Sequence, residues 1–102
     1  MRAIGVSTIY GLFDPVDGLL RYVGRTRHSL KERLSNHCAA PSNKRMRRWI
    51  GGLGMLGHRP RIEVLSVCLY RDEGVEETRM ISRYSEAPLL NDRKFLGWTP
   101  ED

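Results

Sequence analysis

The stretch STIYGLFDPVDGLLRYVGR (7–25) decides the fold. Two runs rich in β-branched and aromatic residues, 7–13 and 19–25, flank the turn residues of 14–18. Asp, Pro and Gly favour a tight chain reversal, and the flanking runs favour extended backbone. The sequence therefore predicts a β-hairpin.

Two tyrosines of this hairpin depend on its register. With the loop centred on Val16, Tyr10 lies opposite Tyr22 and both phenols project from one face; a loop one residue different places them on opposite faces. A cross-strand tyrosine pair is usually a packing contact. Gly24 predicts either a bulge or a close backbone approach.

A capping box follows the hairpin. Ser29 can accept a hydrogen bond from a first-turn amide while Glu32 reaches back to the Ser29 amide. A helix is expected to about Ala40, with an apolar stripe formed by Leu30, Leu34 and Cys38.

Three more elements complete the chain. Ser42 can cap a second helix that ends at the Gly51-Gly52 pair. Residues 61–70 predict a third, largely buried strand, and a last helix starts near Asp72 and ends before Pro88. The order β-β-α-α-β-α predicts an α+β protein.

Length and composition indicate one domain, 1–102, of ordinary globular composition. No apolar run approaches the roughly 20 residues that span a bilayer, and no signal peptide is recognisable, so no membrane partner is expected. Cys38 and Cys68 form no CxxC pair, which argues against disulfides and structural zinc. An intracellular, cytoplasmic location is expected.

The charges are unevenly distributed along the chain. Residues 21–61 contain eleven Lys or Arg and one acid, Glu32, whereas the rest contains six Lys or Arg and eleven acids. Such asymmetry fits binding to a polyanion, because each neutralised phosphate releases counterions. A solvated basic face that aids solubility explains it equally well.

The last helix carries two glutamates with different phases. Glu77 shares a helical face with Ile81 and Tyr84, whereas Glu76 lines up with Met80. A carboxylate that leans toward a core is costly unless it is paired or binds a metal. An ion pair between Glu77 and an arginine of the basic segment is the simpler explanation.

The first helix places Arg33 and His37 on one face, at i and i+4. Arginine suits phosphate binding and histidine suits proton transfer. Both residue types are also common on solvated helix surfaces.

Taken in order, five segments resemble the GIY-YIG nuclease family: T-I-Y (8–10), R-Y-V-G (21–24), L-K-E-R-L-S-N-H (30–37), E-T-R-M-I-S-R-Y (77–84) and P-L-L-N (88–91). The chain departs from the motif at Thr8, where a glycine would stand, and at Val23, where isoleucine would. Valine keeps a β-branched contact. The resemblance implies a three-stranded antiparallel sheet flanked by helices.

The resemblance also implies an activity, metal-dependent hydrolysis of DNA phosphodiesters by an endonuclease. It assigns catalytic roles to Tyr10, Tyr22, Arg33, His37, Glu77 and Asn91. Glu77 would bind a single Mg²⁺ or Mn²⁺ ion, and Arg33 would bind the scissile phosphate. Either Tyr10 or His37 would be the general base, and the sequence leaves both open.

DNA is the expected partner, held by the cations Arg25, Arg27, Lys44, Arg45, Arg47 and Arg48. Trp49 is expected in the core rather than as a base-stacking platform, and Phe95 and Trp98 are expected either to pack on the sheet or to stay mobile. A separate partner would supply targeting, or a homodimer would cut both strands, in a bacterial or phage setting. Two alternatives are a non-cleaving nucleic-acid-binding module and a basic domain that binds an acidic protein.

Overall fold

An antiparallel three-stranded sheet in the order β2-β1-β3 forms the centre of the protein. The computed structural model describes residues 5–92, so the expectations for Phe95 and Trp98 lie outside it. Its elements are β1 (Val6–Phe13), β2 (Leu20–Thr26), α1 (Leu30–Ala39), α2 (Lys44–Met55), β3 (Arg61–Leu69), a 3₁₀ turn (Tyr70–Asp72) and α3 (Glu73–Arg83). The predicted α+β class, the three-stranded antiparallel sheet and the element order are confirmed. None of the helices within 5–92 has the length and apolar character needed to cross a membrane.

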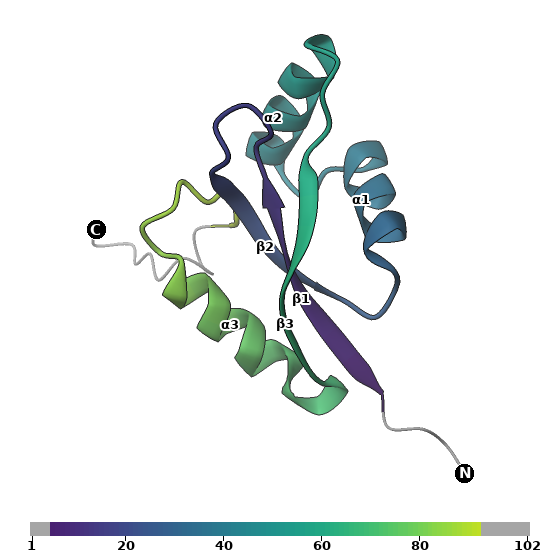
Figure 1. The fold of residues 1–102 in the computed structure, drawn as a ribbon, viewed down its shortest axis with the longest axis vertical. Helices are drawn as coiled ribbons and strands as arrows, with labels where there is room; N and C mark the ends of the chain where they lie inside the picture. The colour runs from purple at the N-terminus through teal and green to yellow at the C-terminus, as the bar shows by residue number, and fades with distance from the viewer. Residues whose placement is uncertain (1–4, 93–102) are drawn as a thin grey trace.

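The two faces of the sheet are covered by different helices (Figure 1). On one face, Ile9 and Val23 pack with Met80 and Ile81 of α3. On the other face, Tyr10 and Leu12 pack with buried α2 residues and with the apolar stripe of α1. Alternation along β1 therefore sends successive side chains into two separate cores.

The hairpin register differs from the expected one without separating the tyrosines. Tyr10 pairs with Gly24 because the ladder at this point is centred on Asp17 rather than on Val16. Moving the centre by one residue moves the partner by two, so the side-chain face is preserved. The expectation that such a shift would divide the phenols is wrong: the rings of Tyr10 and Tyr22 lie 6.3 Å apart.

Gly24 is a site of close approach, the second of the two explanations for this glycine. A Cβ atom built there would lie 2.6 Å from Cζ of Tyr10 and 2.8 Å from Cε2 of Tyr22. The rings can cross the β2 backbone at this point only because it carries no side chain. The bulge of this strand pair lies instead between Leu12 and Phe13.

The start of α1 is as predicted, and the bounds of α2 are not. Ser29 Oγ accepts from the Glu32 amide at 3.1 Å. Asn43, rather than Ser42, caps α2 by accepting from the Met46 amide at 2.9 Å.

Gly51 and Gly52 do not end α2. The helix continues to Met55 because Met46, Ile50 and Leu53 form one buried stripe, and their packing outweighs the low helix propensity of glycine. The chain leaves the helix at Gly57, whose φ of +78° suits a residue without a Cβ.

The third strand is not largely buried, which corrects the prediction. As an edge strand, β3 pairs only with β1 among residues 5–92. Val64 and Val67 are 54% and 61% exposed. A bulge at Leu65 also breaks the strict alternation on which the burial pattern was based.

Candidate active site

Three predicted catalytic residues form a hydrogen-bonded cluster beneath α1. The phenol oxygen of Tyr10, on β1, accepts from Nε of Arg33 at 3.0 Å and lies 2.6 Å from Nε2 of His37. Arg33 and His37 are one turn apart on α1, so both reach the same point on the sheet. Tyr10 is fully buried and His37 is almost fully buried, so neither is an ordinary surface residue.

Burial sets the protonation of this cluster. Desolvation and then the neighbouring Tyr22 raise the pKa of Tyr10, although Arg33 partly opposes the shift. Desolvation, followed by the positive charge of Arg33, lowers the pKa of His37 to about 4. At neutral pH the pair is therefore a neutral phenol beside a neutral imidazole that can accept a proton.

Tyr22 completes the aromatic wall of the cluster. Its ring lies 5.0 Å from that of His37 in an edge-on arrangement. Burial raises the pKa of Tyr22, so its hydroxyl stays protonated at neutral pH. Tyr22 is half-buried and so is closer to solvent than Tyr10.

Glu77 approaches β2 from α3, on the opposite face of the sheet. Its carboxylate is half-buried and lies 3.8 Å from Nε of Arg25. Burial raises the pKa of Glu77, while Arg25 lowers it. The simpler explanation, an arginine partner from the basic segment, is thus present in the structure.

The two glutamates of different phase both lean toward the sheet. Glu76 accepts from Ser66 Oγ at 2.5 Å and pairs with Arg79 at 3.4 Å. Its oxygens are therefore used by partners near β3, whereas Glu77 faces the β2 side.

A one-ion site fits Glu77. Within residues 5–92 no group of three or more His, Cys, Asp or Glu side chains could hold a metal. Mg²⁺, however, keeps several waters and is commonly held by one or two carboxylates. The desolvated carboxylate of Glu77 is a suitable single ligand, because a cation there would offset the cost of its burial.

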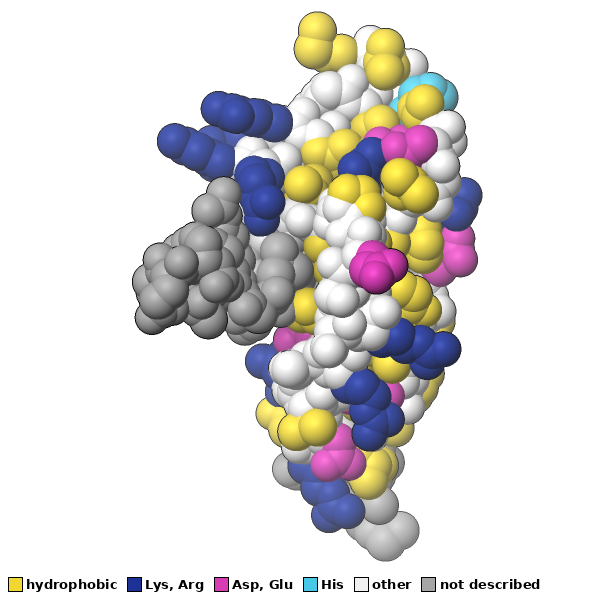
Figure 2. Space-filling view, turned by 90° about the vertical axis from the view of Figure 1, so that its left-hand side faces the viewer, with side chains coloured by type: hydrophobic (Ala, Val, Ile, Leu, Met, Phe, Trp, Pro, Cys, Tyr) yellow, Lys and Arg dark blue, Asp and Glu magenta, His cyan; other side chains and the backbone are white. Residues whose placement is uncertain are grey.

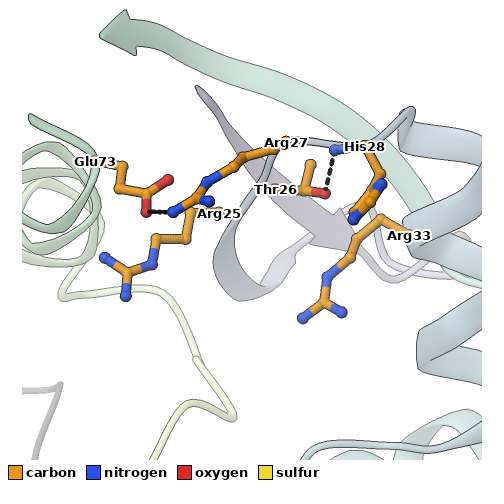
Figure 3. Close-up of a pocket in the computed structure, with 6 residues that line it drawn as sticks. All are labelled: Arg25, Thr26, Arg27, His28, Arg33 and Glu73. Carbon is orange, nitrogen blue, oxygen red and sulfur yellow. Dashed lines mark hydrogen bonds and ion pairs between the residues drawn. The ribbon is translucent and has the colours of Figure 1, made fainter. Parts of the chain in front are cut away.

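An open basin of about 360 Å³ lies beside the end of β2 (Figure 3). We call it the β2 basin; it is lined by Arg25, Thr26, Arg27, His28, Arg33 and Glu73. Figure 3 shows Arg25, from β2, and Arg33, from α1, on opposite sides of the basin. Two guanidinium groups that line one basin suit a phosphate.

A clamp beside the basin was not foreseen from the sequence. Glu73 accepts from Ser7 Oγ and, at 2.9 Å, from Arg27 Nη2. The Arg27 guanidinium also lies 3.3 Å from the ring centre of Tyr70. Arg27 therefore ties α3 to β2 and is less free than Arg33 to bind DNA. The sequence feature that could have indicated Glu73 is its position one helical turn before Glu77, on the same face of α3.

Asn91 lies at the β2 edge, and both polar atoms of its side-chain amide form hydrogen bonds with Val23. Its Oδ1 accepts from the Val23 amide at 3.1 Å and its Nδ2 donates to the Val23 carbonyl at 2.8 Å. Asn91 is buried, so it holds the segment after α3 against the strand that carries Gly24.

The remaining predicted DNA-binding cations form a separate exposed group on α2: Lys44, Arg45, Arg47 and Arg48. Figure 2 shows Lys and Arg side chains gathered at the height of α2, with others below. Trp49 is only half-buried: it packs against the core of the α1–α2 face, and its indole N–H donates to Asp14 at 2.9 Å.

No protein-family description, curated protein or solved structure matches this chain.

Proposed function

We propose that this protein is a metal-dependent DNA endonuclease of the GIY-YIG type. The observation that carries the proposal is the buried Tyr10 phenol, held between Arg33 and His37 at 3.0 and 2.6 Å. Burying the polar groups of Tyr10 and His37 beside a half-buried arginine is costly, and a purely structural role would be served by apolar side chains. The cationic basin beside the cluster supplies a fitting place for a phosphodiester.

Arg33 has two tasks in this proposal. Its Nε already donates to Tyr10, and the rest of the guanidinium faces the β2 basin, where it would bind a scissile phosphate oxygen. An arginine at this position would stabilise the negative charge that develops on the phosphoryl group. Drawing Arg33 toward the phosphate would also uncover the buried Tyr10 oxygen.

Tyr10 and His37 would move the proton together. The attacking water gives its proton to the Tyr10 oxygen, the phenol proton passes to Nε2 of His37, and the hydroxide oxygen bonds to phosphorus as the P–O bond to the leaving alkoxide breaks. This division removes the need for a free phenolate, which burial disfavours. His37 starts in the neutral state that this transfer needs. Because its pKa is low, it then passes the proton on to solvent, and the leaving alkoxide takes up a proton from water.

Glu77 would hold the single Mg²⁺ or Mn²⁺ ion. When bound, the ion supplies stabilisation of the leaving oxygen. Arg25 now occupies the neighbourhood of this carboxylate, so it would turn toward the DNA when the site is loaded.

Nicking of supercoiled plasmid tests the proposal, with Mg²⁺ or Mn²⁺ compared with EDTA. Glu77→Gln should reduce nicking by at least about 100-fold. Glu76→Gln is the matched control, because it alters the neighbouring half-buried glutamate whose partners lie near β3. Equal losses in the two variants would contradict a specific role for Glu77.

The alternative function is a nucleic-acid-binding module that does not cut. The Arg25–Glu77 pair favours it, since this contact leaves the carboxylate neutralised without a metal. DNA binding with no cleavage of plasmid, flap or branched substrates would support this module. Weak DNA binding at every salt concentration would instead favour an acidic protein partner.

A further inference from the structure

A second cavity, of about 420 Å³, lies at the other end of β2. We call it the Trp49 cavity; it is lined by Arg21, Arg45, Arg48, Trp49 and Leu90. It lies between α2, the start of β2 and the segment after α3, whereas the β2 basin lies beside the end of β2.

The cavity has cations that are available to a ligand. Arg45 and Arg48 are exposed, and no carboxylate of residues 5–92 forms an ion pair with either. Arg45 Nη2 donates to the Asn91 carbonyl at 2.5 Å, which orients the guanidinium without neutralising it. Two neighbouring guanidinium groups, one of them oriented, attract phosphate.

A β-bulge brings Arg21 into the same cavity. Leu12 pairs with Tyr22 and Phe13 with Leu20, so Arg21 is the extra residue of β2. Bulges commonly redirect a side chain beside a functional site. The guanidinium is held by Asp17 at 2.5 Å and lies 3.7 Å from Asp14, while its Nε is buried with no hydrogen-bond partner within 5–92. Arg21 is thus a wall of the cavity fixed by two carboxylates, and the positive charge offered to a ligand comes from Arg45 and Arg48.

Trp49 gives the cavity an aromatic surface. Burial alone would raise the pKa of Asp14, but hydrogen bonds from Trp49 and from backbone amides lower it, so Asp14 is an ionised anchor for the indole. The anchored ring is half-buried and lines the cavity, which differs from the core position expected from the sequence. A fixed indole beside arginines is a platform on which an unpaired base stacks.

The two sites lie within reach of one DNA strand. Arg21 and Arg25 are four residues apart on β2, about 13 Å at the usual rise of a strand. That distance corresponds to about four nucleotides along one strand of a duplex, and fewer when the strand is unstacked and extended.

We propose that the Trp49 cavity binds an unpaired nucleotide of the DNA strand whose phosphate lies in the β2 basin, so that flapped or branched DNA is preferred over intact duplex. The inference rests on the proposed function in taking DNA as the ligand. It adds a subsite and a substrate class, because a base can stack on Trp49 only where the strand is unpaired.

Fluorescence of Trp49 tests the subsite directly. The chain has two tryptophans, so Trp98→Phe in the full-length protein leaves Trp49 as the only one. Short oligothymidylate should quench its emission in a saturable, salt-dependent way, whereas a blunt duplex should quench it much less. Arg45→Gln with Arg48→Gln should weaken this binding about tenfold or more. Absence of quenching by the single strand would overturn the proposal.

Lys31→Gln is the control, because Lys31 is an exposed cation of α1 that lines neither the Trp49 cavity nor the β2 basin. An equal weakening in Lys31→Gln would also overturn the proposal, since it would indicate diffuse attraction.

Cleavage separates this inference from the proposed function. If quenching occurs but no substrate is cut, the nuclease proposal fails and the subsite stands. If flap and duplex are cut at equal rates without quenching, the nuclease stands and the subsite fails.

Discussion

The two faces of the sheet divide the candidate site between them. On the α1–α2 face, Tyr10 and His37 are buried and neutral, and their nearest charge is the cation Arg33. On the α3 face, Glu77 meets Arg25 of β2, and Glu73 meets Arg27, the residue that follows β2. Groups that would move a proton thus lie on one face, and carboxylates lie on the other.

One small sheet can therefore hold proton-transfer groups on one face and charged carboxylates on the other. Carboxylates placed beside His37 would favour its protonated form, and no carboxylate of residues 5–92 shifts its pKa. Glu77 nevertheless contributes to the raised pKa values of Tyr10 and Tyr22 from the α3 side. The two faces meet at β2, where Gly24 leaves room for the Tyr10 ring. The variants described next test this difference between the two faces.

The largest effect is expected on the α1–α2 face. Tyr10→Phe removes the hydroxyl that joins Arg33 to His37 and should lower the nicking rate about 10²- to 10⁴-fold. Tyr22→Phe, in the neighbouring half-buried ring, should have a much smaller effect. Single-turnover rates over a pH range give the measurement. An unchanged pH–rate profile in Tyr10→Phe would remove Tyr10 from the proton path.

His37 should make stability depend on pH. Its pKa is about 4 in the folded protein and 6.5 when unperturbed, so the folded state binds fewer protons between these values. Stability is therefore full above about pH 6.5 and falls as the pH drops toward 4, by up to about 3 kcal/mol. Urea unfolding across this range measures the loss.

His37→Gln is the comparison that isolates this effect. The variant should lose the His37 part of the slope, while Glu77, whose pKa is shifted the opposite way, contributes equally to both proteins. Parallel pH curves for wild type and variant would show that His37 titrates normally, and the neutral character of this face would then be lost.

Gly24→Ala tests the meeting point of the two faces. The new methyl group would overlap the rings of Tyr10 and Tyr22, so a loss of about 1–3 kcal/mol in unfolding free energy is expected. Gly52→Ala, inside α2 with no atom within 4 Å of its added Cβ, should instead be neutral or stabilise by about 0.5–1 kcal/mol. A tolerated Gly24→Ala would contradict the steric argument.

The smallest effect concerns two arginines of the β2 basin. Arg33→Gln should reduce the slope of log affinity against log salt by about 0.9, as expected for one lost phosphate contact. Arg27→Gln should change the slope less, because Glu73 and Tyr70 already engage that guanidinium. Filter binding over a salt series measures both, and equal slopes would mean that Arg27 is free to meet DNA.

Local signals predicted the elements and their order. The hairpin turn, the Ser29 cap and the apolar stripe of α1 depend on neighbours in the sequence, and each is present. The prediction that α2 ends at Gly51 and Gly52 was wrong because packing of the buried stripe of α2 outweighs the low helix propensity of glycine. The exposure of β3 was missed because edge position depends on topology rather than on composition.

The sequence predicted which residues belong to the candidate site, but it did not predict how they are arranged in space. Helical spacing put Arg33 and His37 on one face, but it gave no sign that His37 is buried against Tyr10. The Glu73 clamp and the Trp49 cavity join residues far apart in the chain, and no local pattern encodes such contacts.

The pairing of Asn91 with Val23 bears on aggregation. An amide side chain that offers one donor and one acceptor imitates a single peptide group of a neighbouring strand, but it cannot propagate the ladder. Exposed sheet edges are templates on which chains stack into fibrils, and this contact ends the template at the middle of β2. The Asn91 side chain thus protects the β2 edge against misassembly, and the proposed function leaves the same edge open to a ligand.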